Sequence, residues 1–442
     1  MRPPADPSLP LHGIRVLDLT IVWAGPFATQ ILADLGAEVI RVESLQRPDV
    51  NTRGQVQVPK AMLAYGPWGA GYPNRDPGER PWERSGIINL NSRNKLSMTL
   101  DWTRPHGMDV FRRLFACSDV LIDNNAAGTL EKLGITWEQL SPLNPRMVWV
   151  AMPAYGASGP YKYHKGYGAN VEALVGHTAL RGYTDSDATT TYPVYHADAA
   201  AASTAAFATL AALWHRRRSG RGQLIDLSQA ECMVHHLSQA VMDYSLNGRS
   251  QSTVGNRHAW MAPHDIVPCA GEDRWLAIAV DGDAEWARLC HAIDRDDLVD
   301  DARFATLTAR RRNQDALRDE LSAWSRQHTP IAAMQLLEAA GVRCGALHTA
   351  AEVLEDEQLA HRGFFERVDV PGAGVYPFPG AQAQLSETPL HIRRPAPRVG
   401  EDNEYLYREV LGVSDEEYAQ LVAEEHIGTT YVELRRAAGA PT

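Results

Sequence analysis

One carboxylate stands out for the residues around it. Asp198 ends the sequence Tyr195-His-Ala-Asp198 and precedes an alanine-rich helical stretch, residues 199–214. One interpretation is a helix N-cap, a position that aspartate often fills, and the spacing alone favours it. The other is a nucleophile, because a helix N-terminus keeps a carboxylate ionised at neutral pH and small alanines leave room for an acyl group. Both interpretations stay open at this point.

A second candidate is the turn Trp23-Ala-Gly-Pro26, which precedes another helical stretch. Backbone N–H groups at such a turn can hold a phosphate or a carbonyl oxygen. The G-x-G-x-x-G pattern of nicotinamide dinucleotide sites, the P-loop and the G-x-S-x-G elbow are all missing from the sequence. Glu43, at the end of a strand, has the position of the ribose-binding carboxylate of dinucleotide sites, but it lacks the glycine pattern that accompanies such a carboxylate. The turn therefore predicts a site for an anion or a carbonyl without identifying the ligand.

No set of residues is spaced like a metal site. His164, His177 and His196 are not spaced as ligands, and the adjacent His235 and His236 would point in different directions from a helix. No H-E-x-x-H or C-x-x-C pattern occurs, and the five cysteines show no paired spacing. We therefore expect neither a bound metal nor a disulfide framework.

The elements that must position these residues alternate between strands and helices. Apolar runs at residues 14–19 and 38–43 flank a helical stretch at residues 27–35, which makes a βαβ unit. The same alternation recurs in strands at residues 96–100, 118–122 and 147–152 and in a helix at residues 105–115. We therefore predict an α/β fold with an open parallel sheet, whose ligands bind at the carboxyl ends of the strands.

The chain changes character after Asn247. Strands are predicted at residues 265–268 and 275–280, and helical patterns follow them as far as residue 340. This part is expected to form a second, smaller α+β domain. Between residues 50 and 84, prolines, glycines and aromatics run without periodicity, which predicts a long functional or partner-wrapping loop.

Composition excludes several classes of protein. The 442 residues carry 43 Lys and Arg against 54 Asp and Glu, a net charge of −11. Nucleic acid is therefore not an expected partner, although a local basic pocket would suffice for a small anion. The N-terminus lacks the apolar core of a signal peptide, and no run reaches the roughly 18 apolar residues that span a bilayer. We expect a cytoplasmic protein without membrane contact.

Short segments spread along the chain form a recognisable series. They are Leu11-His-Gly-Ile-Arg-Val-Leu-Asp18, Ala24-Gly-Pro26, Leu35-Gly-Ala-Glu-Val-Ile-Arg-Val-Glu43, Asn144-Pro-Arg146, Gly220-Arg-Gly-Gln223, Gly255-Asn-Arg257 and Pro395-Ala-Pro397. This series resembles the family III CoA-transferases, the CaiB/BaiF type. Because the segments cover nearly the whole chain in the right order, the resemblance is far more specific than any one motif.

The resemblance implies a Rossmann-like large domain built from both ends of the chain. Residues 1–225, completed by residues 385–442, would form this CoA-binding domain, and residues 226–384 would form linkers and the small domain. Two subunits would thread each other like links of a chain, giving an interlocked homodimer. The long loops of the sequence suit such threading.

The resemblance also reverses the balance between the two interpretations of Asp198. The family's catalytic aspartate lies just before the alanine- and glycine-rich helix that precedes the Gly-Arg-Gly-Gln signature, and that position is Asp198 here. The implied reaction moves CoA from an acyl-CoA to a carboxylic acid through an aspartyl mixed anhydride and an aspartyl-CoA thioester. The thioester energy is kept throughout, so ATP is not required, and coenzyme A enters as substrate.

The CoA-contacting positions of the family fall in several loops of this chain. They are Trp23, Ala24, Leu100, Asp101, Thr103, Asn124, Lys132, Lys165 and Tyr167. Lys132 and Lys165 would pair with the phosphates of CoA, with solvated surface lysines as the alternative. An arginine that often follows the second strand is Ser44 here, so Arg41 or Arg47 would take its place.

Two other functions stay open. A CoA-thioester isomerase or racemase on the same fold is disfavoured, because racemases of this superfamily use a His-Asp pair where this chain has Tyr167-Gly168. A tyrosine is a poor proton shuttle at neutral pH. A non-catalytic partner subunit is disfavoured by the presence of Asp198. The sequence does not disclose the donor and acceptor acids, nor whether a homo- or a hetero-oligomer forms.

Overall fold

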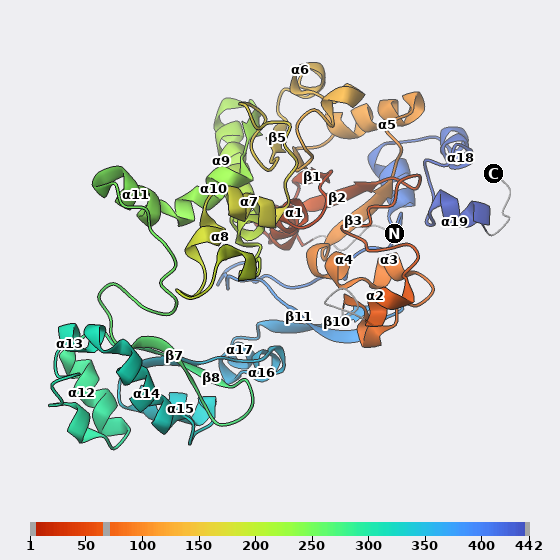
Figure 1. The fold of residues 1–442 in the computed structure, drawn as a ribbon. Coiled ribbons are helices and arrows are strands. Elements are labelled where there is room, and N and C mark those ends of the chain that lie inside the picture. The colour runs from red at the N-terminus through yellow and green to blue at the C-terminus, as the bar shows by residue number, and fades with distance from the viewer. Residues whose placement is uncertain (1–5, 65–70, 438–442) are drawn as a thin grey trace. The chain divides into compact units, whose positions relative to one another are not determined.

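The computed structural model describes residues 6–64 and 71–437 of the chain (Figure 1). The chain divides into two compact units. The first comprises Met1–Val175, Pro193–Met242 and Ala360–Thr442, and the second comprises Gly176–Tyr192 and Asp243–Leu359. The assignment of residues 1–225 with 385–442 to one domain and of 226–384 to the other stays a prediction.

The first unit is built on a six-stranded parallel sheet with the strand order β3-β2-β1-β4-β5-β6. Its strands are β1 (Arg15–Asp18), β2 (Glu38–Glu43), β3 (Lys95–Thr99), β4 (Val120–Asp123), β5 (Val148–Ala151) and β6 (Gln223–Asp226). All but β6 are largely buried, as a parallel sheet covered by helices on both faces requires. The order reverses between β1 and β4, and α/β sheets bind ligands in the crevice at such a reversal.

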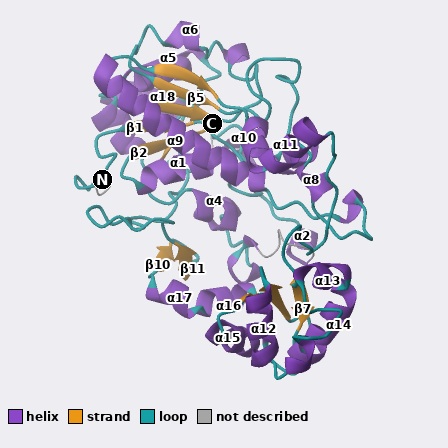
Figure 2. Ribbon diagram, turned by 90° about the vertical axis from the view of Figure 1, so that its left-hand side faces the viewer, coloured by secondary structure: helices purple, strands orange, loops and turns teal. Residues whose placement is uncertain are grey.

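Helices cover both faces of this sheet (Figure 2). One layer consists of α5 (Pro105–Ala116), the π-helical turn η6 (Tyr405–Val410) and α18 (Asp415–Ala423). The other consists of α1 (Ala24–Asp34) and α9 (His196–Ser219). Leu17 packs in the first layer's core and its neighbour Val16 in the second, because side chains alternate along a strand. The C-terminal segment is thus part of the core around this sheet.

Helix α9 is longer than the predicted helix at residues 199–214 and spans His196–Ser219. Its length and composition would also suit a membrane span. Half of its most apolar window is nevertheless buried inside the protein, where its alanines pack with α1 and the sheet. These are the contacts of a core helix, and the expectation of no membrane contact stays a prediction.

Short elements complete the first unit. They are the helices α2 (Lys60–Ala64), α3 (Pro81–Arg84), α4 (Gly86–Asn91), α6 (Trp137–Leu140), α7 (Gly168–Leu174), α10 (Gln229–His236) and α19 (Val432–Ala437), and the antiparallel hairpin of β10 (Phe365–Val370) and β11 (Gly374–Pro379). Helix α11 (Ser238–Asn247) runs from the first unit into the second. The long loop predicted at residues 50–84 contains α2 and α3, and its residues 65–70 lie outside the described part of the chain.

The second unit contains a three-stranded antiparallel sheet of β7 (His264–Pro268), β8 (Trp275–Ala279) and β9 (Arg343–Ala346). Its helices are α8 (His177–Leu180), α12 (Asp283–Ala292), α13 (Leu307–Arg312), α14 (Gln314–Ser325), α15 (Pro330–Ala339) and α16 (Ala350–Glu355), and α17 (Glu357–His361) leads back to the first unit. The predicted fold class, an open parallel α/β sheet with a smaller α+β part, is confirmed. The interlocked dimer stays a prediction.

Candidate active site

The crevice at the reversal of strand order is built by Asn124 and the turn that follows β1. The Asn124 side-chain amide accepts from the Ile21 N–H at 2.8 Å and donates to the Ile21 carbonyl at 2.8 Å. A Cβ on Gly25 would lie 2.4 Å from Cβ of Thr20 and 3.0 Å from Cγ of Asn124, so glycine is required there. The turn is therefore fixed against the loop after β4, directly before the start of α1.

Asp198 lies in the first turn of α9 and is only 6% exposed. The helix begins at His196, because Tyr195 adopts a left-handed backbone (φ 54°) and becomes the N-cap. The interpretation of Asp198 as the N-cap is therefore wrong. A Cβ on Gly168, the first residue of α7, would lie 1.9 Å from Oδ2 of Asp198. The carboxylate thus rests directly on the backbone of Gly168.

The surroundings of Asp198 shift its proton affinity. Burial, together with the nearby Glu172 carboxylate, raises the pKa of Asp198 to about 6, although the Ala24 backbone N–H donates to the carboxylate and opposes the shift. Burial outweighs the helix N-terminus in raising this pKa, but the shift is too small to protonate the group at neutral pH. At pH 7 the carboxylate still predominates by about ten to one.

Four of the predicted CoA-binding residues gather around this carboxylate. Ala24 donates to it, and Asn124 holds the turn that carries Ala24. The Trp23 ring lies 5.9 Å from the Tyr195 ring, centroid to centroid. Tyr167 directly precedes Gly168, and its side chain is 59% exposed. The structure therefore brings Trp23, Ala24, Asn124 and Tyr167 together with Asp198.

Leu100, Asp101 and Thr103 form a separate group after β3. Leu100 is buried in the core. The Asp101 carboxylate accepts from the Thr103 N–H at 3.1 Å and from Nε of Arg104 at 2.8 Å. Strand β2 separates β3 from β1, and no hydrogen bond or ion pair within residues 6–64 and 71–437 links this loop to Asp198. These three residues are thus not brought into the crevice itself.

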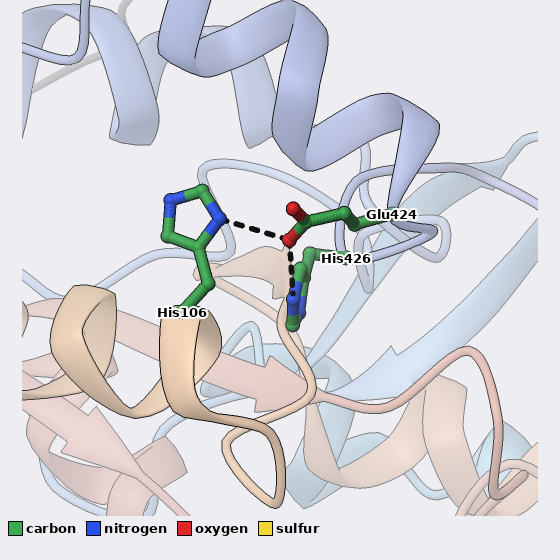
Figure 3. A group of neighbouring side chains, drawn as sticks. All are labelled: His106, Glu424 and His426. Atoms are coloured by element: carbon green, nitrogen blue, oxygen red, sulfur yellow. Dashed lines mark hydrogen bonds and ion pairs between the residues drawn. The ribbon is translucent and has the colours of Figure 1, made fainter.

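His106, Glu424 and His426 form a cluster next to the loop after β3 (Figure 3). Their nitrogen and oxygen atoms lie within 4.8 Å of one another. Such a group could hold a metal ion by proximity alone. The Nδ1 atom of His426, however, accepts from the Asp101 N–H at 3.3 Å and lies 3.4 Å from Nη2 of Arg104. A neutral imidazole whose Nδ1 accepts carries its proton on Nε2, which here faces Oε2 of Glu424 at 3.5 Å. The cluster is therefore better described as a clamp between α5 and the C-terminal segment, and the absence of a metal stays a prediction.

Arg41 is buried in a network of ions. Its guanidinium lies 3.1 Å from Oε1 of Glu43 and 2.9 Å from Oδ2 of Asp49, and it donates to the Thr20 carbonyl at 3.1 Å. Burial alone would raise the pKa of Glu43, but Arg53 and Arg41 lower it to about 2. The structure therefore places Arg41 beneath the turn after β1 with its hydrogen bonds already in use. Arg47, the alternative, is exposed.

The two predicted phosphate partners are exposed. Lys132 lies in the 3-10 turn η3 (Glu131–Leu133) after β4, and Lys165 lies just before α7. In the part of the chain that the structure describes, neither lysine forms an ion pair with another side chain. Both ammonium groups are thus available to an anion.

Sequence reasoning missed Glu172 and the role of Gly168. Glu172 lies in α7, is fully buried, and acts electrostatically on Asp198. The available signal was an acidic residue inside the apolar stretch Val171-Glu-Ala-Leu174. Such residues are rarely buried without a specific partner.

The chain matches the family model of CoA-transferase family III over residues 11–403. It is 32% identical to the succinyl-CoA–D-citramalate CoA-transferase of Chloroflexus aurantiacus, over 95% of this chain and 99% of that protein. It is also 32% identical to the succinate–glutarate CoA-transferase of Agrobacterium fabrum, over 91% of this chain and 96% of that protein. The crystal structure of a CaiB/BaiF family protein from Brucella suis has a TM-score of 0.79 at 30% identity and covers 91% of this chain and 99% of that one.

These findings confirm the resemblance that the sequence segments suggested. The relatives of this chain are named as CoA-transferases, and the family model and the solved structure each match nearly the whole chain. The chain belongs to CoA-transferase family III and is an enzyme that transfers coenzyme A between acyl-CoA thioesters and carboxylic acids.

Proposed function

We propose that Asp198 is the nucleophile of this transfer and that CoA passes through a covalent aspartyl intermediate. The observation that carries the proposal is a buried but still ionised carboxylate, held against Gly168 and the Ala24 N–H beside the crevice of the sheet. An ionised carboxylate shielded from water is a suitable nucleophile for a thioester carbonyl.

Four steps complete the reaction. An Asp198 oxygen attacks the thioester carbonyl carbon, and the C–S bond breaks to give a mixed anhydride and CoA thiolate. The thiolate attacks the aspartyl carbonyl, so that the donor acid leaves as its carboxylate and an aspartyl-CoA thioester remains. The acceptor carboxylate attacks that thioester and again releases the thiolate, which then takes the acceptor's acyl group and restores Asp198. Each tetrahedral oxyanion needs hydrogen-bond donors, and at the start of α1 the backbone N–H of Gly25 is the candidate for this role, since Pro26 has no N–H and the Phe27 N–H donates to the Trp23 carbonyl.

Succinyl-CoA is the donor that we propose, with a short dicarboxylic acid as acceptor. The support is the pair of relatives named for succinyl-CoA with D-citramalate and for succinate with glutarate, each matched over more than nine tenths of both chains.

We place CoA along the carboxyl edge of the sheet. Trp23, Ala24, Asn124 and Tyr167 would surround the thioester end near Asp198. Lys132 and Lys165, both exposed, would bind its phosphates. Asp101, Thr103 and the backbone of Leu100, whose side chain is buried in the core, would contact the part of CoA farther from Asp198. Arg41 would not contact CoA itself but would hold the turn after β1 in place, since its guanidinium already bonds Glu43, Asp49 and the Thr20 carbonyl.

Isomerisation or racemisation has less support. Gly168, one of the two residues that stand where racemases of this superfamily carry their His-Asp pair, offers no acid or base, and the space for a Cβ there is filled by Oδ2 of Asp198. A purely non-catalytic subunit would not need a buried carboxylate in this place.

We also propose a homodimer. On α9, Phe207, Leu210 and Trp214 are 72%, 38% and 62% exposed and follow one another at helical spacing. An exposed apolar stripe of this kind is typical of a subunit interface.

The substitution Asp198→Asn tests the proposal. It keeps the shape of the side chain but removes the nucleophile, so we expect transfer from succinyl-CoA to fall by at least about a thousandfold while CoA still binds. Transfer is measured by mass spectrometry of the acyl-CoA products and binding by calorimetry. Transfer close to the wild-type rate would contradict the proposal.

A further inference from the structure

Glu172 is the least expected residue near the proposed nucleophile. It lies in α7, which packs against α9, and it is fully buried. Burying a carboxylate is costly unless it accepts strong hydrogen bonds. Its bonds therefore indicate what it holds in place.

Those bonds reach the start of α9. Oε1 of Glu172 accepts from the His196 N–H at 2.6 Å, and Oε2 accepts from the Val194 N–H at 3.4 Å. The first N–H groups of a helix have no partner within the helix and need one from outside. The N-cap residue, Tyr195, forms no side-chain capping bond and has a left-handed backbone. Glu172 thus caps α9 from a neighbouring helix.

This cap fixes Asp198. The capped His196 is the first residue of α9, and Asp198 follows it within the same helical turn. The Asp198 carboxylate has little room to move, since its Oδ2 fills the space that a Cβ on Gly168 would occupy. A shift of α9 by about 1 Å would therefore displace the nucleophile, and misplacements of that size cost about a hundredfold in rate.

Glu172 also places a second carboxylate beside the first. The two like charges lie in a largely buried region, where repulsion is weakly screened. The repulsion exists while Asp198 is a free carboxylate and vanishes once Asp198 becomes a neutral anhydride or thioester. The arrangement therefore disfavours the free carboxylate relative to the covalent forms, and it makes the carboxylate more basic.

From these contacts we propose that Glu172 is a positioning residue for Asp198, holding the first turn of α9 in place and opposing the charge of the nucleophile until it is acylated. This inference rests on the proposed function of Asp198. Other titratable side chains around the same turn are Tyr167 of α7, Tyr195 and His196 at the start of α9, and His236 of α10, whose ring lies 4.7 Å from that of His196. Among these groups and Glu172, the one that acts electrostatically on Asp198 is Glu172.

The test compares Glu172→Gln and Glu172→Ala with the wild type. Glutamine keeps an oxygen for the His196 N–H but removes the charge, whereas alanine removes both. The pH dependence of kcat is measured with saturating succinyl-CoA and glutarate. Exposed Glu231→Gln on α10 removes the same charge away from this contact and serves as the matched control.

We expect the acid limb of the Glu172→Gln profile to shift to lower pH by about one unit, with kcat reduced and KM for succinyl-CoA nearly unchanged. Glu172→Ala should lose about a hundredfold in kcat because the nucleophile is no longer held. A Glu172→Gln profile that superimposes on those of the wild type and Glu231→Gln would overturn the proposal. Hydroxylamine trapping on the wild type distinguishes failure of the proposed function from failure of the role of Glu172. If Asp198 is not modified, the proposed function fails. If Asp198 is modified, the pH profiles test the role of Glu172 alone.

Discussion

Asp198 and Gly168 show how closely one carboxylate is fitted to its surroundings. A Cβ at residue 168 would lie 1.9 Å from Oδ2 of Asp198, well inside van der Waals contact. The carboxylate cannot keep its position if residue 168 gains a side chain. What matters at residue 168 is therefore that glycine has no side chain.

Gly168→Ala should reduce kcat by about a hundredfold or more, because the added methyl group displaces the nucleophile. Steady-state kinetics with succinyl-CoA measures the effect. Gly345→Ala, where nothing lies within 4 Å of the added Cβ, is the control and should keep wild-type activity. Equal activity of the two variants would contradict the geometry described for Asp198.

The raised pKa of Asp198 predicts a dependence of stability on pH. Its pKa is raised from 3.8 to about 6, chiefly by burial, so the folded protein binds this proton more tightly than the unfolded chain. Stability from this group is therefore present at low pH and is lost as pH rises from 3.8 through 6, by up to about 3 kcal/mol. Asp198→Asn removes the charge and should raise Tm by a few degrees at pH 7.5 but hardly at pH 4.

Thermal denaturation of the wild type and Asp198→Asn at both pH values checks this. An equal difference in Tm at pH 4 and pH 7.5 would show that ionisation of Asp198 is not its source.

At the scale of elements, the loop after β4 and the turn after β1 act together through Asn124. Its two bonds to Ile21, each 2.8 Å, join the loops on either side of the strand-order reversal, and a longer bond of 3.3 Å from the Asn125 amide to the Leu19 carbonyl runs beside them. Asn124→Ala leaves both backbone groups of Ile21 without this partner, at a cost of about 1–3 kcal/mol. We expect kcat/KM for acyl-CoA to fall about ten- to a hundredfold.

The control is Asn144→Ala, which removes an amide that donates to the Ser118 carbonyl at 2.7 Å, away from the crevice. It should change Tm but not KM. If Asn144→Ala and Asn124→Ala alter kcat/KM equally, Asn124 has no particular role at the crevice.

The elements differ in how well the sequence predicts them. Strand β2 falls at residues 38–43 as expected, because its apolar run is buried on both faces. Strand β6 was missed, since it is a four-residue edge strand with mostly exposed side chains and carries no buried pattern. The start of α9 was misplaced because the cap comes from Glu172, a residue that local sequence cannot connect to His196.

The residues of the candidate site also differ in how well the sequence predicts them. The order of family segments along the chain singles out Asp198 as the proposed nucleophile and Ala24 as a CoA-contacting residue, and in the structure the Ala24 N–H donates to Asp198. Gly168 and Glu172 act through contacts across a helix interface, which only the folded chain reveals.

At the scale of the whole molecule, the apolar stripe of Phe207, Leu210 and Trp214 predicts a dimer. The double variant Phe207→Glu with Trp214→Glu should abolish dimerisation, because two charges would have to be buried. Light scattering after gel filtration measures the mass of each species. The control Leu143→Glu, at an exposed site outside the stripe, should stay dimeric. A monomeric wild type would contradict the proposed interface.

Covalent trapping tests the central claim most directly. The protein is incubated with succinyl-CoA and no acceptor, treated with hydroxylamine and digested, and its peptides are mapped by mass spectrometry. The account predicts a hydroxamate on Asp198 that requires succinyl-CoA and is missing from Asp198→Asn. Transfer that proceeds with the modification on another residue, or with no modified residue at all, would contradict it.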